Sequence, residues 1–224
     1  MDDASTDAFA TYLNTVGATG ANVDRGDSDF DIRHALTAGF TYMLPSPRSK
    51  GVSSVFADWS FDAVAFARSA PPVDIFGGLF AGAGIALRPR PNVNPGVPLE
   101  LFGPQYPGGK IFNGAAFSTL PGGQQGNLGR NVLRGFAASQ ADIALQRAFR
   151  LTHSVTLRLR VECFNVFNQP NFGNPVFDLS SPLFGRSTQT LASSLGSGGA
   201  NGGFSPLYQI GGPRSIQLAL RLEF

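Results

Sequence analysis

The last eleven residues alternate strictly between apolar and polar side chains, and this feature restricts the possible folds more than any other. The apolar positions are Ile216, Leu218, Leu220, Leu222 and Phe224. The positions between them are Ser215, Gln217, Ala219, Arg221 and Glu223. Successive side chains of a strand point to opposite faces, so the pattern predicts a β-strand with one apolar and one polar face. A strand of a soluble sandwich shows the same pattern, so the rest of the chain must decide between lipid and water.

Four other segments alternate in the same way, and together they divide the chain into strands and connections. The predicted strands lie near residues 30–44, 54–68, 139–150, 154–168 and 213–224. Short turns are expected at 45–51, where two prolines end the strand, and at 151–154. Gly- and Pro-rich or Gly-, Ser- and Asn-rich sequence predicts long, weakly structured loops at 71–138 and 168–212.

Short turns and long loops therefore follow each other in alternation along the chain. If the strands run up and down, all short turns lie at one end of the sheet and all long loops at the other, which is typical of an outer-membrane barrel. Strands of about ten residues are long enough to cross the hydrocarbon layer when tilted. We expect an all-β, antiparallel up-and-down transmembrane β-barrel segment of about five or six strands, too few to close a barrel, which takes about eight or more.

The polar faces of these strands carry charges that must meet water, because burying an ion in a dry core costs several kcal/mol even when it is paired. The residues expected to face the lumen are Asp142, Arg158, Arg160, Glu162, Arg221 and Glu223. Charge pairs between Asp142 and Arg158, Arg160 or Glu162 are one interpretation; water-exposed charges on adjacent strands are the favoured one.

Aromatic residues near strand ends favour a membrane interface, although aromatic residues that fill a sandwich core remain the alternative. These residues are Phe40, Tyr42, Trp59, Phe61, Phe149 and Phe224. An apolar run of about 18 residues, which a transmembrane helix would need, does not occur in the sequence. The acidic start lacks the apolar core of a secretory signal, so the chain is expected to be either cytoplasmic or, as we favour, the later part of a longer secreted protein.

Composition excludes several other classes of function. Only 14% of residues are charged and the net charge is +2 without a basic run, so no nucleic-acid partner is expected. Cys163 is the single cysteine and is expected to act as a small apolar residue. His34 and His153 have no companions at metal-ligand spacing, and no catalytic motif is present. We therefore expect neither an enzyme nor a cofactor or metal site.

Several motifs resemble the carboxy-terminal part of the barrel of Oar-like TonB-dependent receptors. They are GNLGRN at 126–131, RVECFNVFNQPNFGNP at 160–175 and PRSIQLALRLEF at 213–224, supported by SDFDIRH at 28–34 and WSFD at 59–62. The resemblance covers nearly the whole chain. It implies an integral protein of the outer membrane of Gram-negative cells that takes up a large or scarce solute with energy delivered by TonB.

The same resemblance implies a barrel of roughly 22 strands around an amino-terminal plug. Neither the plug nor a TonB-interaction box is found in this sequence, so we expect a carboxy-terminal fragment. The partners that the resemblance implies are outer-membrane lipid, the plug, the remaining strands and the TonB system. The family also implies that the last strand is the signal that the barrel-assembly machinery reads. Its residues would be Ile216, Leu218, Leu220, Leu222 and Phe224.

The alternative from another class is a soluble, secreted β-sandwich that binds carbohydrate, with the apolar face of each strand turned inward. Folding as a monomer without detergent would favour the sandwich. In either case, arginine and aromatic side chains of the long loops are candidates for ligand contact, and the sequence singles out no subset of them.

Overall fold

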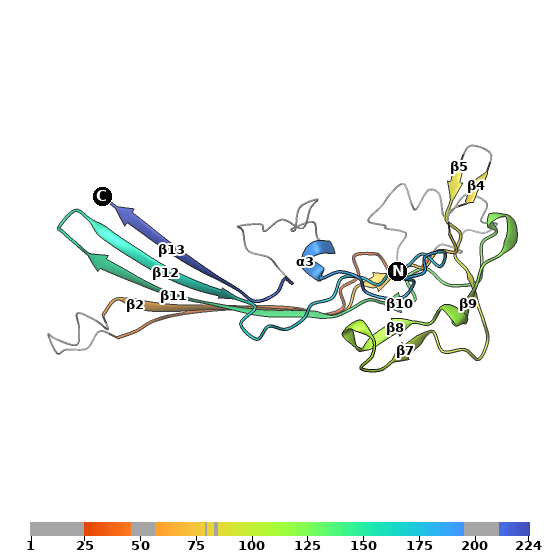
Figure 1. Cartoon of the computed structure of the whole chain (residues 1–224), viewed down its shortest axis with the longest axis horizontal. Coiled ribbons are helices and arrows are strands. Elements are labelled where there is room, and N and C mark those ends of the chain that lie inside the picture. Colours follow the sequence, from red (N-terminus) through yellow and green to blue (C-terminus); the bar gives the residue numbers. More distant parts are fainter. Residues whose placement is uncertain (1–24, 46–56, 79, 83–84, 195–210) are drawn as a thin grey trace.

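The chain forms one five-stranded antiparallel sheet and a compact unit built from its long loops (Figure 1). The computed structural model describes residues 25–45, 57–78, 80–82, 85–194 and 211–224. The strands of the sheet are β1 (Ala35–Met43), β2 (Trp59–Arg68), β11 (Ala138–Arg150), β12 (Thr156–Phe164) and β13 (Ser215–Glu223). They pair in chain order, each antiparallel to its neighbours, so the predicted up-and-down arrangement is confirmed.

The register brings the apolar positions of all five strands to one face. Tyr42, Phe61, Leu145, Val161 and Leu218 form one cross-strand row. Side chains that are directly opposite in an antiparallel pair point to the same side of the sheet, and every second row therefore lies on this apolar face. The alternation predicted for each strand is confirmed, although β2 also places Val64 and Phe66 on the polar face, opposite Asp142 and Gln140.

Cys163 and Arg147 also lie on the apolar face, for different reasons. Cys163 is a free, half-buried thiol opposite Ile143 and Ile216, where it acts as a small apolar side chain as expected. Arg147, which breaks the apolar pattern of β11, pairs with Trp59 and Leu159.

The two ends of the sheet differ as the turn lengths predict. Residues 151–155 join β11 to β12 in a tight turn, in which the Leu151 amide donates to the Val155 carbonyl at 2.9 Å. Figure 1 shows this turn at the end of the sheet that lies away from the loop unit. The turn predicted at 45–51 and the strand start predicted at 54–56 lie largely outside the described residues.

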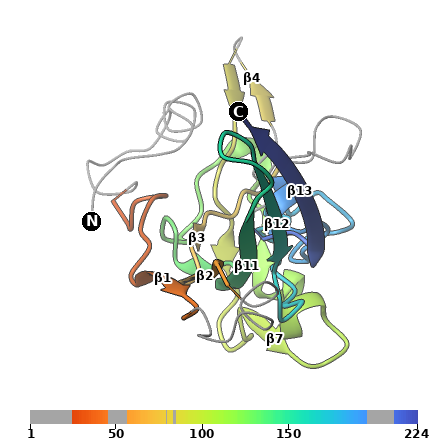
Figure 2. The same ribbon diagram turned by 90° about the vertical axis from the view of Figure 1, so that its left-hand side faces the viewer.

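The sheet is curved, and it is open at both edges among the described residues. Figure 2 looks along it from the turn end and shows the strands following one another in an arc. The twist of neighbouring strands gives such a sheet the shape of part of a barrel wall. Each of the two outer strands, β1 and β13, has one neighbour in the part of the chain that the structure describes.

The long loops were expected to be weakly structured, but the structure shows that they fold together. In their described parts, the short elements form four two-stranded sheets and several single helical turns. The strand pairs are β3 (Pro72–Val73) with β10 (Leu133–Arg134), β4 (Phe80–Gly82) with β5 (Ile85–Leu87), β6 (Asn92–Val93) with β9 (Phe117–Ser118) and β7 (Glu100–Phe102) with β8 (Lys110–Phe112). The helical turns are η1 (Pro107–Gly109), η2 (Gly114–Ala116), η3 (Pro121–Gly123) and α3 (Leu191–Ser194). Within the described ranges, no helix has the length and apolar character needed to span a membrane.

A small apolar core holds this loop unit together. Its buried residues are Val73, Ile75, Phe112, Ala116, Phe117, Leu128 and Leu133. The second long loop contributes as well, since Phe184 packs edge-on against Phe117 with ring centres 5.8 Å apart. The close approach of the second long loop to β8 depends on Gly185, which has φ +76° and lies where a Cβ would collide with the Phe112 backbone. Segments more than 60 residues apart therefore share one core.

Candidate functional site

The polar face of the sheet carries a network of hydrogen bonds centred on Arg160. Its Nε donates to Glu162 Oε1 at 2.8 Å, and its Nη1 donates to Asp62 Oδ2 and to Gln146 Oε1, both at 3.0 Å. The Thr41 hydroxyl donates to the other oxygen of Asp62 at 2.9 Å. One guanidinium therefore connects side chains of β2, β11 and β12, and Thr41 extends the network to β1.

Ala144 provides the space for this network. It lies directly between Asp62 on β2 and Glu162 on β12, and only 6% of its surface is exposed. Strands in a sheet are spaced by about 4.8 Å, so the two carboxylates belong to strands about 10 Å apart. Arg160 can bridge them because the residue between them ends at a methyl group.

A second group of charges lies on the same face, nearer the tight turn. Arg158 Nε donates to Glu223 Oε2 at 2.9 Å, and Arg221 Nε lies 3.4 Å from Glu223 Oε1. The side chains of Arg158 and Arg221 are 54% and 78% exposed, and such exposed pairs contribute little stability. These charges are therefore solvated. Arg158, Arg221 and Glu223 share one face with Arg160 and Glu162, as the alternation predicts. That this face lines a lumen stays a prediction.

Asp142 lies on the same face but has different partners from those considered for it. It accepts hydrogen bonds from Gln140 Nε2 at 2.8 Å and from the Asn165 amide at 2.7 Å, and the described residues form no ion pair with it. Gln140 in turn accepts from the Gly211 amide at 2.7 Å. Asp142 is nearer the loop end than Arg160, so it fixes the chain where the second long loop leaves and rejoins the sheet.

The apolar face of the sheet is exposed, most of all along the last strand. The exposed fractions there are 70% for Ile216, 71% for Leu218, 70% for Leu220, 46% for Leu222 and 92% for Phe224. Leu36, Phe40 and Tyr42 at the opposite edge are also more than half exposed. In a sandwich this face would pack against a second sheet. Exposed apolar surfaces of this extent mark a contact with lipid or with a partner.

Arg147 is the one charged side chain that β1, β2, β11, β12 and β13 place on this face, and it is enclosed by aromatic rings. Its guanidinium carbon lies 4.4 Å from the ring centre of Phe149 and 5.5 Å from that of Trp59. Only 8% of Arg147 is exposed. The negative faces of the rings stabilise the cation, which allows a charge on an otherwise apolar surface.

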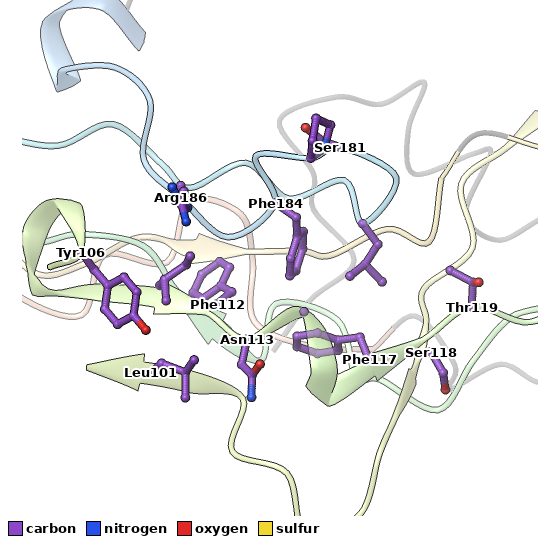
Figure 3. Close-up of a pocket in the computed structure, with 14 residues that line it drawn as sticks. Leu101, Tyr106, Phe112, Asn113, Phe117, Ser118, Thr119, Ser181, Phe184 and Arg186 are labelled. Atoms are coloured by element: carbon purple, nitrogen blue, oxygen red, sulfur yellow. The ribbon is translucent and has the colours of Figure 1, made fainter. Parts of the chain in front are cut away.

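A second candidate site is a groove of about 780 Å³ in the loop unit. Figure 3 shows the rings of Phe112, Phe117 and Phe184 gathered at its centre, with Tyr106 and Arg186 on one side and Ser118 and Thr119 on the other. Phe184 packs edge-on against Phe117 with ring centres 5.8 Å apart. Because Phe112 and Phe117 are buried and Phe184 is half-buried, the first two form the floor and the third offers an accessible ring.

Some polar side chains of the groove form hydrogen bonds within its walls, and others are available to a ligand. Asn113 donates to the Pro98 carbonyl at 2.9 Å and accepts from the Ala115 amide at 3.2 Å, so its side chain is occupied. Within the described part of the chain, the side chains of Tyr106, Thr119 and Arg186 make no hydrogen bond. A hydroxyl-rich or anionic ligand would find donors there.

A cluster of charges joins the segment before β1 to the loop unit. Arg134 Nη2 donates to Asp27 and, at 2.5 Å, to Asp31 Oδ2, while Nη1 donates to the Asp31 carbonyl at 2.9 Å. Asn131 Nδ2 donates to Asp29 Oδ1 at 2.5 Å. The hydrogen bond from Arg134 is the main cause that lowers the pKa of Asp31 below its ordinary value of 3.8; desolvation opposes it, and the charges of Arg134 and Arg33 add to it.

No sequence pattern indicates the groove, and the alternation of the strands predicts only part of the Arg160 network. Asp62 lies on the polar face of β2, but its contact with Arg160 depends on the register of two strand pairs. The groove residues come from two separate loop segments that show no alternation, so no sequence signal connects them. Among the described residues, no group of three or more His, Cys, Asp or Glu side chains is arranged to hold a metal ion.

Comparison with known proteins agrees with the curved, two-faced sheet. No curated protein and no solved structure matches the chain. The family described as "Outer membrane beta barrel domain" matches residues 1–217, nearly the whole sequence. The chain therefore belongs to the outer membrane beta barrel domain family and is an outer-membrane barrel protein.

Proposed function

We propose that this protein is an integral outer-membrane transporter, the carboxy-terminal part of the barrel of an Oar-like TonB-dependent receptor. Its function would be the energised uptake of a large or scarce solute. One observation carries the proposal: the curved sheet exposes apolar side chains on one face and solvated charges on the other. Lipid on the first side and a water-filled lumen on the second satisfy both faces.

The charged face favours a wide barrel over a narrow one. Barrels of about eight strands fill their interior with side chains, while barrels of 16 or more strands leave room for water or for a plug. Arg158 and Arg221 extend from this face with more than half of their side chains exposed. Such solvated side chains suit a wide, hydrated interior to which the five strands contribute one part of the wall.

The position of the loop unit supports an orientation. Outer-membrane barrels have short turns in the periplasm and long loops outside the cell. The turn at 151–155 would then be periplasmic, and the loop unit with its groove would face the medium. A solute would meet the groove before it meets the lumen.

Uptake by cells tests the energised step. Cells that produce the complete reading frame, and matched cells that lack it, are given mixed oligosaccharides and peptides, and depletion of the medium is measured by mass spectrometry. We expect a solute to disappear only where the protein is made and TonB is intact. Depletion that continues without TonB would show a passive channel instead, and the transport proposal would be wrong.

Thiol labelling tests the two faces of the wall. In a Cys163→Ser background, Arg158→Cys is expected to react with a water-soluble maleimide that has access to the lumen, while Leu218→Cys is expected to be protected until detergent is added. Equal labelling of both positions in intact membranes would contradict the assignment. It would favour the soluble sandwich only if the chain also fractionated with soluble protein.

A further inference from the structure

We infer that the groove in the loop unit binds an acidic oligosaccharide, that is, a short chain of sugar rings that carries carboxylates. The inference rests on the proposed uptake function and adds a ligand class and a binding site to it. The groove lies between β7, β8 and β9 on one side and residues 179–186 on the other. Its volume of about 780 Å³ falls within the range of about 300 to 1,000 Å³ that is usual for small-molecule sites.

The accessible rings favour sugar. Phe184 and Tyr106 are both half-buried, so each keeps part of a flat face or edge open to the groove. The carbon face of a pyranose is apolar and packs against such rings, because removing apolar surface from water is favourable. The ring of Phe184 is also held in place, since it packs on Phe117 and its amide donates to the Ser181 carbonyl at 3.0 Å.

The polar groups around these rings suit a ligand that is rich in hydroxyls and negatively charged. Tyr106 and Thr119 provide hydroxyls that can both donate and accept, and among the described residues neither has an internal partner. Among the described residues that line the groove, Arg186 is the single charged one, and it is exposed. A carboxylate on the ligand can therefore pair with a guanidinium without meeting a competing carboxylate from the wall.

The groove is also preformed. The Gly185 amide donates to the Val176 carbonyl at 2.8 Å, and the Gly185 carbonyl accepts from the Phe112 amide at 3.2 Å. These bonds fix residues 184–186 against β8, so the segment that carries Phe184 and Arg186 needs little ordering when a ligand binds. Preorganisation of this kind lowers the entropic cost of binding.

Calorimetric titration of the purified full-length protein in detergent tests the inference. The probes are oligogalacturonate, oligomannuronate and hyaluronan fragments, with a neutral cello-oligosaccharide and an acidic peptide of similar length for comparison. We expect at least one uronate to bind more tightly than the neutral sugar and the peptide. Failure of all three uronates to bind, or equal binding of the peptide, would overturn the inference.

Two variants separate the roles of charge and ring. Arg186→Gln is expected to weaken uronate binding about tenfold or more, because a charge-assisted hydrogen bond is lost, while the neutral sugar is affected little. Phe184→Leu is expected to weaken both sugars by similar factors. Arg214→Gln, an exposed arginine outside the groove, serves as the matched control. Uronate binding that Arg186→Gln leaves unchanged would place the ligand elsewhere.

The binding assay and the uptake assay test the two proposals separately. Uronate binding without TonB-dependent uptake would leave the groove assignment standing and refute the transport proposal. TonB-dependent uptake of some other solute, without uronate binding, would refute the groove assignment alone.

Discussion

Ala144 is the residue on which the polar-face network depends most directly, although it makes no polar contact itself. It is 6% exposed and lies between the two carboxylates that Arg160 bridges. A larger side chain at this position would occupy the path of the guanidinium. The Arg160 bond to Asp62 at 3.0 Å would then be broken, while the bond to Glu162 within the same strand could remain.

We therefore expect Ala144→Leu to destabilise the folded barrel. Overpacking a well-packed site costs typically about 1–3 kcal/mol, and the lost ion pair adds to this. The measurement is the temperature at which the protein in detergent loses its heat-modifiable migration on a gel. Ala65→Leu, the same change on the exposed apolar face, is the control and is expected to have little effect. Equal stability of the two variants would show that the Arg160 network does not depend on the space above Ala144.

At the scale of elements, the alternation of side chains predicted the strands well and their ends less well. β11 begins one residue before the predicted range and ends where it was predicted, since its alternation is continuous. The first strand was predicted from residue 30 but begins at Ala35. The pattern of residues 30–34 is strand-like, but Asp31 binds Arg134 of the loop unit, and this tertiary contact directs the segment away from the sheet.

The last strand carries the prediction that belongs to this scale. Deleting Phe224 is expected to lower the amount of protein in the outer membrane severalfold, because the exposed apolar row of β13 with its final aromatic would be the surface that the assembly machinery recognises. Quantitative blotting of outer-membrane fractions is the measurement, and Phe224→Tyr, which keeps the aromatic ring, is the control. Unchanged assembly after the deletion would count against a signal at this position.

At the scale of the whole molecule, the loop unit was the part that the sequence could not predict. Its core joins Val73, Phe112 and Leu133, which are separated by tens of residues of Gly- and Pro-rich sequence. No periodicity marks these positions, because each contributing strand is only two or three residues long. The groove that these loops form was therefore equally invisible, while the polar face, built from long strands, could be assigned by alternation alone.

The charge cluster that attaches residues 25–34 to the loop unit is expected to make this attachment sensitive to acid. Since the pKa of Asp31 is lowered in the folded protein, its carboxylate stabilises the fold at pH values above its ordinary 3.8, and this contribution is lost as the pH falls through the lowered value. Hydrogen exchange, corrected for intrinsic rates, should therefore show residues 25–34 and 127–136 losing protection below about pH 4.

Asp31→Asn should reduce this protection already at pH 7 and make it depend less on acid, because Asp27 and Asp29 of the same cluster remain. Asp178→Asn is the control, since the side chain of Asp178 binds only its neighbour Ser180 in the described part of the chain. Wild-type protection that remains constant from pH 6 to pH 2.5 would show that the attachment does not depend on the ionised carboxylate.

Among the described residues, β1 and β13 each have one side without a neighbouring strand, and this has a consequence for how the wall can exist in a bilayer. Acyl chains offer no hydrogen-bond donors or acceptors, and each backbone group left unsatisfied there costs several kcal/mol. Both outer strands are nine residues long, so each presents a row of amide and carbonyl groups that must be met by further backbone. These five strands therefore need enough further strands to close the barrel, about three or more if the smallest barrels have about eight.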